Sequence, residues 1–138
     1  ITRSQLIKYL NDGGMPAIFS VRDDQAKSAL FEDWVQLTCT RDITQFKTIK
    51  LDADLTYQVL IQCAKLEEPT RPAIARALHE DKRKIETHLK ALCELFVLHR
   101  FSPHPLSKGK PIYLILDPGI ANYLGASFMR KLHITLLN

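Results

Sequence analysis

The chain has 138 residues, of which 46% are hydrophobic and 25% charged, and its formal net charge is +4. This is the composition of a globular protein with enough apolar residues to bury a core of its own. No apolar run approaches the roughly 18 residues of a membrane span, and no charged-then-apolar leader opens the chain, so we expect a cytoplasmic protein without a membrane partner.

The first 68 residues predict three helices. The first helix begins at a cap, Thr2 or Ser4, and ends at the strong stop signal Asn11-Asp-Gly-Gly14. The chain opens on Ile1 rather than Met and enters this helix at once, so we expect it to be a piece of a longer protein. The segment Gly13-Gly14-Met-Pro16 predicts a turn, and its two glycines are too isolated to form a phosphate-binding loop.

The second predicted helix runs from Asp23 or Asp24 to about Cys39. The segment Arg41-Asp42-Ile43 closes it, and the charged pair Arg41-Asp42 is most simply a local ion pair or a cap. We expect the inward positions of this helix to be those at helical spacing, namely Ala26, Leu30, Trp34 and either Leu37 or Val35.

The third helix is predicted from Asp52 or Asp54 to Leu66, with acidic residues at the N-terminus, where the helix dipole favours them. Residues 44–51, which precede it, predict a loop or a short helical turn. The apolar positions of the third helix, which we expect to face the core, are Leu55, Val59, Leu60, Cys63 and Ala64.

The sequence pattern of residues 69–116 predicts two helices joined by a tight turn. A turn at 69–72 leads into a short apolar helix over 73–78, and a polar break at 79–81 precedes an amphipathic helix from Lys82 to about Phe96. The apolar stripe of this second helix is the strongest periodic signal in the chain, and we expect it to be buried. Its members, at i, i+4, i+7 and i+11, are Ile85, Leu89, Leu92 and Phe96.

Two strand-like runs follow, at 97–101 and 111–116, and a loop rich in Pro, Ser, Gly and Lys joins them at 102–110. Helix, turn, helix and hairpin is the order of a winged helix-turn-helix, in which the loop is the wing. The C-terminal residues predict a short helix over 120–124 and an apolar tail. That tail is apolar enough for us to expect a continuation of the chain or a partner to cover it.

The fold class is therefore mainly α with a small β-hairpin. Within one compact domain we expect a helical N-terminal part that supports a winged helix-turn-helix, followed by a C-terminal helix and the apolar tail. The three parts are residues 1–68, 69–116 and 117–138.

The basic surplus of the chain is concentrated in residues 70–110. That stretch holds nine Lys or Arg and four Asp or Glu, whereas residues 1–69 hold eight and ten, and residues 111–138 hold two and one. Such an asymmetry is typical of a nucleic-acid-binding module. We predict DNA contacts from the second helix of the module and from the hairpin and wing: Lys82, Arg83, Lys84, Thr87 and Lys90, then Arg100, Lys108 and Lys110.

The outward face of the helix from Lys82 carries mixed charges, because Glu86 and Glu94 lie among its basic residues. This mixture favours a second hypothesis, in which the module packs on another domain or subunit and regulates it. Winged helices serve both purposes, so the fold alone does not choose between DNA binding and a regulatory contact.

Enzymatic chemistry is not predicted for these residues. No motif context supports a Ser-His-Asp or Cys-His arrangement. Three widely spaced cysteines, Cys39, Cys63 and Cys93, indicate buried thiols in a reducing compartment rather than a disulfide framework or a zinc site. The histidines fit no standard metal spacing, and we expect solvent-facing rings that add positive charge at low pH: His79, His88, His99 and His104.

Five segments, taken in order, resemble the uncharacterised domain that follows the ATPase core in predicted AAA+-superfamily ATPases of bacteria and archaea. The resemblance covers nearly the whole chain. The segments are Gly13-Gly14-Met-Pro16, the Trp34 helix running into Arg41-Asp42-Ile43, Ile74-Ala-Arg-Ala-Leu78, the helix with His88-Leu-Lys-Ala-Leu and Phe96, and Gly109-Lys-Pro-Ile-Tyr-Leu-Ile-Leu-Asp-Pro-Gly-Ile-Ala-Asn-Tyr-Leu124.

The resemblance implies a longer ATPase, whose N-terminal core binds ATP and Mg²⁺ and whose region beyond this domain has a nuclease-like fold. That core and that region are the implied partners, beside DNA, and we also consider self-association. Ser107-Lys-Gly-Lys-Pro111 is not a P-loop, and the strand-like run ending in Asp117, similar to a Walker B strand, has no Walker A to work with. We therefore expect neither ATP hydrolysis nor a cofactor within these residues.

Overall fold

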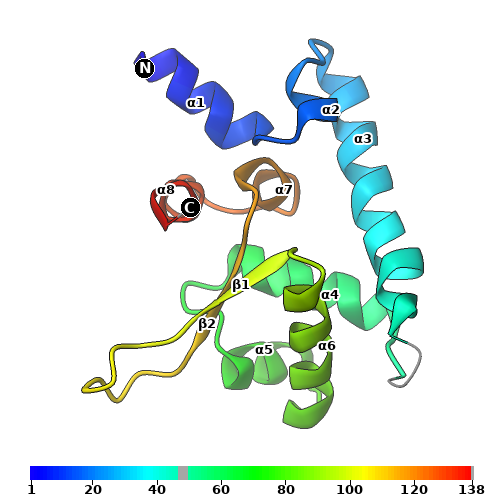
Figure 1. The fold of residues 1–138 in the computed structure, drawn as a ribbon, viewed down its shortest axis with the longest axis vertical. Helices are drawn as coiled ribbons and strands as arrows, with labels where there is room; N and C mark the ends of the chain where they lie inside the picture. The colour runs from blue at the N-terminus through cyan, green and yellow to red at the C-terminus, as the bar shows by residue number, and fades with distance from the viewer. Residues whose placement is uncertain (47–49, 138) are drawn as a thin grey trace.

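The computed structural model describes residues 1–46 and 50–137, which form eight α-helices and one two-stranded antiparallel hairpin. The predicted fold class, mainly α with a small β-hairpin, is confirmed. In Figure 1, α1, α7 and α8 lie at one end of the molecule, α5, α6 and the hairpin lie at the other, and α3 runs along one side. Over the part of the chain that is described, no helix combines the length and the apolar character needed to cross a membrane.

Two helices occupy the N-terminus. α1 (Arg3–Asp12) begins with a capping box, in which the Thr2 hydroxyl accepts from the backbone N–H of Gln5 and the Gln5 side chain accepts from that of Thr2. It ends at Gly13, whose φ of 73° favours glycine. α2 (Pro16–Phe19) follows, where the sequence predicts only a turn. The prediction missed this helix because a single helical turn is too short to show a period.

α3 (Asp24–Leu37) is capped by Asp23, whose carboxylate accepts from the N–H of Ala26 at 2.8 Å. It runs on as a π-helical turn (Thr38–Asp42) and a 3-10 turn (Ile43–Gln45), past the predicted end at Cys39. Arg41 Nε donates to Asp42 Oδ1 at 2.9 Å, which confirms the local ion pair. The predicted loop at 44–51 falls partly on residues 47–49, which lie outside the described residues.

The buried face of α3 differs from the predicted one. Val35, one of the two alternatives for the last inward position, is buried as predicted and Trp34 is half-buried, but Ala26 and Leu30 are exposed and Phe31 is buried instead. α3 lies at the side of the molecule, so only a narrow stripe of it is covered. Because its apolar residues occupy more than one face, periodicity alone could not select that stripe.

α4 (Ala53–Lys65) lies at the centre of the fold and contacts α5, α6 and β2. Asp52 caps it by accepting from the N–H of Leu55 at 2.7 Å. All five predicted core positions are buried and belong to the main hydrophobic cluster: Leu55, Val59, Leu60, Cys63 and Ala64. Periodicity succeeded here because α4 is covered along its whole apolar face.

α5 (Arg71–Leu78) and α6 (Lys82–Glu94) are joined by a three-residue turn in which His79 adopts a left-handed conformation with φ 53°. Asp81 caps α6 by accepting from two backbone N–H groups of its first turn. Three members of the predicted stripe of α6 are fully buried, as expected: Ile85, Leu89 and Leu92.

Phe96, the fourth predicted member of that stripe, is 82% exposed, so its prediction is wrong. The helix ends at Glu94, and Phe96 takes a left-handed conformation with φ 57°. The N–H of Val97 donates to the carbonyl of Leu92 at 3.0 Å and that of Phe96 to Cys93 at 3.0 Å, which together form a Schellman motif. This reversal turns the Phe96 ring into solvent, and Val97 is buried in its place.

The hairpin consists of β1 (Leu98–Phe101) and β2 (Ile112–Ile115), in antiparallel register with Leu98 opposite Ile115. Its strands are shorter than the predicted runs, and the intervening loop extends away from the helices (Figure 1). The N–H of Tyr113 donates to the carbonyl of Pro69 at 3.0 Å, which fixes β2 beside the segment that enters α5.

Two C-terminal helices complete the fold, α7 (Pro118–Tyr123) and α8 (Phe128–Leu137). The predicted apolar tail is thus largely helical, and Ile134 is buried against the core. Four other large apolar side chains of α8 are between 53% and 73% exposed: Phe128, Met129, Leu136 and Leu137.

Polar contacts join α7 and α8 to the N-terminal helix, more than 100 residues away in the chain. Asp117 Oδ2 accepts from the N–H of Gly14 at 2.8 Å. The buried Lys131 ammonium donates to Asn11 Oδ1 at 2.7 Å and to Asn122 Oδ1 at 2.8 Å. The two ends of the described chain therefore pack into one unit.

Candidate nucleic-acid interface

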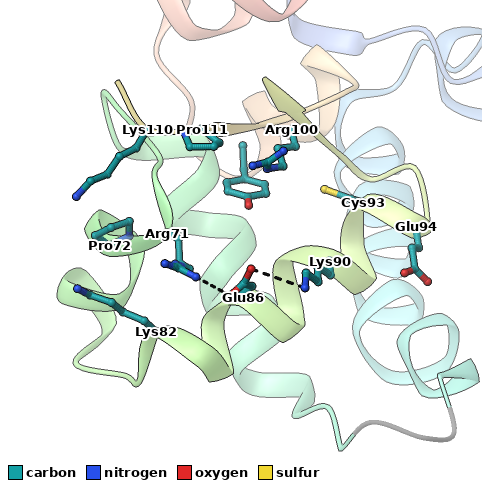
Figure 2. Close-up of a pocket in the computed structure, with 11 residues that line it drawn as sticks. Arg71, Pro72, Lys82, Glu86, Lys90, Cys93, Glu94, Arg100, Lys110 and Pro111 are labelled. Atoms are coloured by element: carbon teal, nitrogen blue, oxygen red, sulfur yellow. Dashed lines mark hydrogen bonds and ion pairs between the residues drawn. The ribbon is translucent and has the colours of Figure 1, made fainter. Parts of the chain in front are cut away.

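A groove of about 730 Å³ lies between α5, α6 and the hairpin (Figure 2). Five basic and two acidic side chains line it, which gives the groove a formal charge of +3. The basic side chains are Arg71, Lys82, Lys90, Arg100 and Lys110, and the acidic ones are Glu86 and Glu94.

The wall contributed by α6 is one helical face. Lys82, Glu86, Lys90 and Cys93 recur at i, i+4, i+8 and i+11, so they share a side of the helix next to the buried stripe. On the hairpin, Arg100 lies directly opposite Tyr113 across the two strands, so both project from the same face of the hairpin. The groove thus combines side chains from α6 with side chains from the two strands of the hairpin, such as Lys82 and Tyr113, which lie far apart in the chain.

Glu86 lies at the middle of the groove between two cations. Its Oε2 is 2.5 Å from Arg71 Nη1, and its Oε1 is 3.7 Å from Lys90 Nζ; Figure 2 shows the three side chains meeting. The hydrogen bond from Arg71, opposed by partial burial, lowers the pKa of Glu86 below its ordinary value. Glu86 is therefore ionised at neutral pH.

The other three cations of the groove are not held in this way. Lys82, Arg100 and Lys110 are exposed and form no ion pair with any residue in 1–46 or 50–137. Arg100 donates only to the Ser102 hydroxyl, at 3.2 Å. These three charges are available to an incoming anion without the loss of an ion pair among the described residues.

Of the eight predicted contact residues, the structure brings four together in the groove: Lys82, Lys90, Arg100 and Lys110. The other four lie outside it. Arg83 and Lys84 are exposed on α6, where Lys84 Nζ lies 3.6 Å from Glu80, and Lys108 is exposed on the loop. The Thr87 hydroxyl is half-buried and donates to the carbonyl of Arg83 at 2.9 Å.

Among the five basic side chains of the groove, Arg71 is the one that was not predicted from the sequence. It is the first residue of α5, and its partner Glu86 lies 15 positions away on another helix. Periodicity within one helix carries no information on such a pair. Its presence in the basic stretch 70–110 was the one available signal.

His88 is fully buried, so the expectation that it faces solvent is wrong. Its Nε2 accepts from the backbone N–H of Asp52 at 3.1 Å, and its Nδ1 lies 2.8 Å from the carbonyl oxygen of Lys84. Both bonds are made when the proton is on Nδ1, so His88 joins α6 to the start of α4. The expectation holds for the other three, which are exposed: His79, His99 and His104.

Asp117 does not offer a free carboxylate at the end of β2. Its Oδ1 accepts from the N–H of Ile120 at 3.0 Å and caps α7, while its Oδ2 accepts from the N–H of Gly14. These contacts do not fit a ligand of nucleotide-bound Mg²⁺. Nor do the residues at 1–46 and 50–137 bring together three His, Cys, Asp or Glu side chains in a way that could hold a metal ion.

The three cysteine thiols are free, and Cys93 faces the groove. Burial raises the pKa of Cys39 to about 12 and that of Cys63 further still, and partial burial also raises the pKa of Cys93. All three are therefore protonated near neutral pH and are weak nucleophiles.

Comparison with known proteins gives one match. A family model described as a domain of unknown function, DUF8612, matches residues 3–131. No curated protein and no solved structure matches the chain.

Proposed function

Because the chain belongs to the DUF8612 family, whose description assigns no function, we propose from the site that it is a winged helix-turn-helix module that binds DNA in the groove between α6 and the hairpin. The observation that carries this proposal is the convergence of five basic side chains from separate elements on one groove with a formal charge of +3. Phosphate binding by clustered Lys and Arg supplies most of the affinity of such modules and depends steeply on salt.

The exposed cations of α6, the hairpin and the loop make the proposed contacts with DNA. Lys82, Arg100 and Lys110 neutralise backbone phosphates, and this fixes the position of α6 on the duplex. Arg83, the neighbour of Lys82 on the exposed side of α6, reaches a base edge or a second phosphate. The loop at 102–110 acts as the wing and carries Lys108 along the backbone.

Fluorescence anisotropy against a random duplex, at low and at physiological salt, tests the proposal. The groove variant carries Lys82→Ala, Arg100→Ala and Lys110→Ala. The matched control carries Arg83→Ala, Lys84→Ala and Lys108→Ala, which removes the same charge at positions outside the groove, including the proposed outer contacts Arg83 and Lys108. We expect the groove variant to lose about tenfold or more in affinity and to show a salt slope lower by about 3, and the control to lose less.

Two outcomes would count against this assignment. Absence of binding by the unaltered chain at low salt would refute DNA binding altogether. A larger loss of affinity in the control than in the groove variant would show that the main contact is made by the outer side of α6 and the tip of the loop and not by the groove.

We further propose that this module is a non-catalytic part of a longer cytoplasmic AAA+-superfamily ATPase, as the resemblance of its segments implies. ATP and Mg²⁺ would bind to the ATPase core and not to these residues, since Asp117 is engaged in backbone contacts. Three free thiols are in keeping with a reducing cytoplasm.

A second candidate function is a regulatory contact with the ATPase core, the nuclease-like region or a second copy. The observation that favours it is the exposed apolar surface of α8, where Phe128 and Met129 are each more than half exposed. Sedimentation of the chain with Phe128→Ser and Met129→Ser, beside the unaltered chain, tests self-association. Equal masses at all concentrations would exclude a second copy as the partner of α8.

A further inference from the structure

Glu86 is the acidic residue at the middle of the basic groove. Its carboxylate holds Arg71 at 2.5 Å and Lys90 at 3.7 Å, so it engages two of the five cations that line the groove. A carboxylate between two cations occupies the same kind of position that a phosphate oxygen would take. This arrangement rests on two helices, since Arg71 begins α5 and the other two residues belong to α6.

We propose that Glu86 is an internal competitor for phosphate, which limits the affinity of the groove for nucleic acid by engaging Arg71 and Lys90. The inference rests on the proposed function and concerns the regulation of the same site. A phosphate that reaches the middle of the groove has to displace Glu86 from these cations. Elsewhere in the groove, Lys82, Arg100 and Lys110 bind phosphates without that cost, because they have no ion pair among the described residues.

The exposure of these side chains sets the size of the effect. Arg71 and Glu86 have side-chain exposures of 42% and 35%, and that of Lys90 is 71%, so solvent screens both ion pairs. Releasing the two cations from such pairs should raise the affinity for DNA by about three- to tenfold. It should also add up to about two to the salt slope, because each newly engaged phosphate contributes about 0.9.

Glu94 provides a matched control. It lies on the same helix and lines the same groove, but no Lys, Arg or His of residues 1–46 and 50–137 lies within ion-pair distance of it. In Figure 2 its carboxylate is remote from the Arg71–Glu86–Lys90 cluster. Glu86→Gln and Glu94→Gln therefore change the net charge equally, and only the first releases Arg71 and Lys90.

The experiment measures anisotropy of a labelled random duplex against the unaltered chain, Glu86→Gln and Glu94→Gln over a series of salt concentrations, with thermal unfolding to verify that all three are folded. We expect tighter binding and a steeper salt dependence for Glu86→Gln, and a smaller gain with an unchanged slope for Glu94→Gln. Equal gains in the two variants would overturn the inference, because the effect would then be one of net charge.

Weaker binding by Glu86→Gln would also overturn it, since Glu86 would then orient Arg71 and Lys90 for phosphate rather than compete with it. Both of these results leave DNA binding itself in place. Failure of all three proteins to bind at low salt would instead refute the proposed function, and the inference with it.

Discussion

Gly119 at the start of α7 lies directly against the carbonyl of Asp12 at the end of α1. A Cβ added to Gly119 would lie 2.5 Å from the Asp12 oxygen and 2.7 Å from the amide nitrogen of Gly13. Both atoms belong to the backbone, so neither can rotate away. The close approach of these two helices therefore depends on a glycine at position 119.

Gly119→Ala should consequently destabilise the fold. Because the added methyl group forces α1 and α7 apart, we expect a loss of about 1–3 kcal/mol in the free energy of unfolding, measured by urea denaturation. Gly14→Ala is the control, since its Cβ would meet the Tyr9 ring at an ordinary 3.4 Å and should change stability by less than about 0.5 kcal/mol. Equal effects of the two changes would contradict the proposed close approach.

Phe96→Gly should stabilise the protein. Residue 96 is left-handed, with φ 57°, and its ring is exposed, so glycine relieves backbone strain without loss of a buried contact. We expect a gain of about 0.5–1 kcal/mol, seen as a rise of a few degrees in Tm. Phe96→Ala removes the same ring but keeps the Cβ, and it should show no gain. A gain from alanine as large as that from glycine would attribute the effect to the ring.

His88→Ala should be strongly destabilising, although His88 is a polar residue. Its removal leaves a cavity in the core and deprives the Asp52 N–H of its acceptor. We expect a loss of about 2–4 kcal/mol in urea denaturation. The exposed His133 serves as the comparison, and His133→Ala should change stability by less than about 0.5 kcal/mol. A small effect of His88→Ala would show that the link between α4 and α6 is not needed.

Asp12 should contribute stability that disappears in acid. Partial burial raises its pKa, but hydrogen bonds and charge from Lys8 at 2.6 Å and Lys27 at 3.0 Å outweigh burial and lower the pKa below its ordinary value. A carboxyl group whose pKa is lower in the folded state stabilises the fold above its unfolded pKa, and that contribution is lost as the pH falls through the folded value.

The free energy of unfolding of Asp12→Asn, measured by urea denaturation between pH 7 and pH 3, should therefore lie below that of the unaltered chain at neutral pH. The difference should shrink as the pH drops below about 4. A difference that stays constant over this range would rule out ionisation of Asp12 as its cause.

Cys93 should report directly on the groove. It is half-buried, whereas Cys39 and Cys63 are buried, so a thiol reagent should label Cys93 before the other two. Because the pKa of Cys93 is raised, its labelling should be slower than that of cysteine in solution. Excess duplex DNA should slow this labelling if DNA fills the groove that Cys93 lines. Mass spectrometry of the labelled peptides assigns the site. Labelling of Cys93 at the same rate with and without bound DNA would locate the complex elsewhere.

Most of the helices and the hairpin could be predicted from sequence because caps and periodic apolar positions are local signals, whereas α2 was predicted as a turn and α8 as an apolar tail. α4 begins after Asp52 and α6 begins at Lys82, where the sequence indicates, and the apolar face of α4 is buried as predicted. Phe96 was missed because the left-handed turn that ends α6 is made by a residue other than glycine. A non-glycine residue at such a position gives no sequence signal.

The groove could be predicted only in part. Charge asymmetry pointed to residues 70–110, but it did not separate Lys90, which lines the groove, from Lys84, which lies outside it. The role of Arg71 depends on a contact between two helices, and the burial of His88 depends on the position of Asp52. Both follow from tertiary packing, which the residue pattern of one helix does not contain.

The contacts of α1 with α7 and α8 also bear on how the protein folds. During synthesis the Gly14 amide emerges 103 residues before the Asp117 carboxylate that binds it, and Asn11 emerges 120 residues before Lys131. Closing loops of this length is slow compared with forming helices or the hairpin. The N-terminal helix therefore cannot make these contacts until the last helices have been synthesised, so the unit that α1 forms with α7 and α8 is completed late in folding.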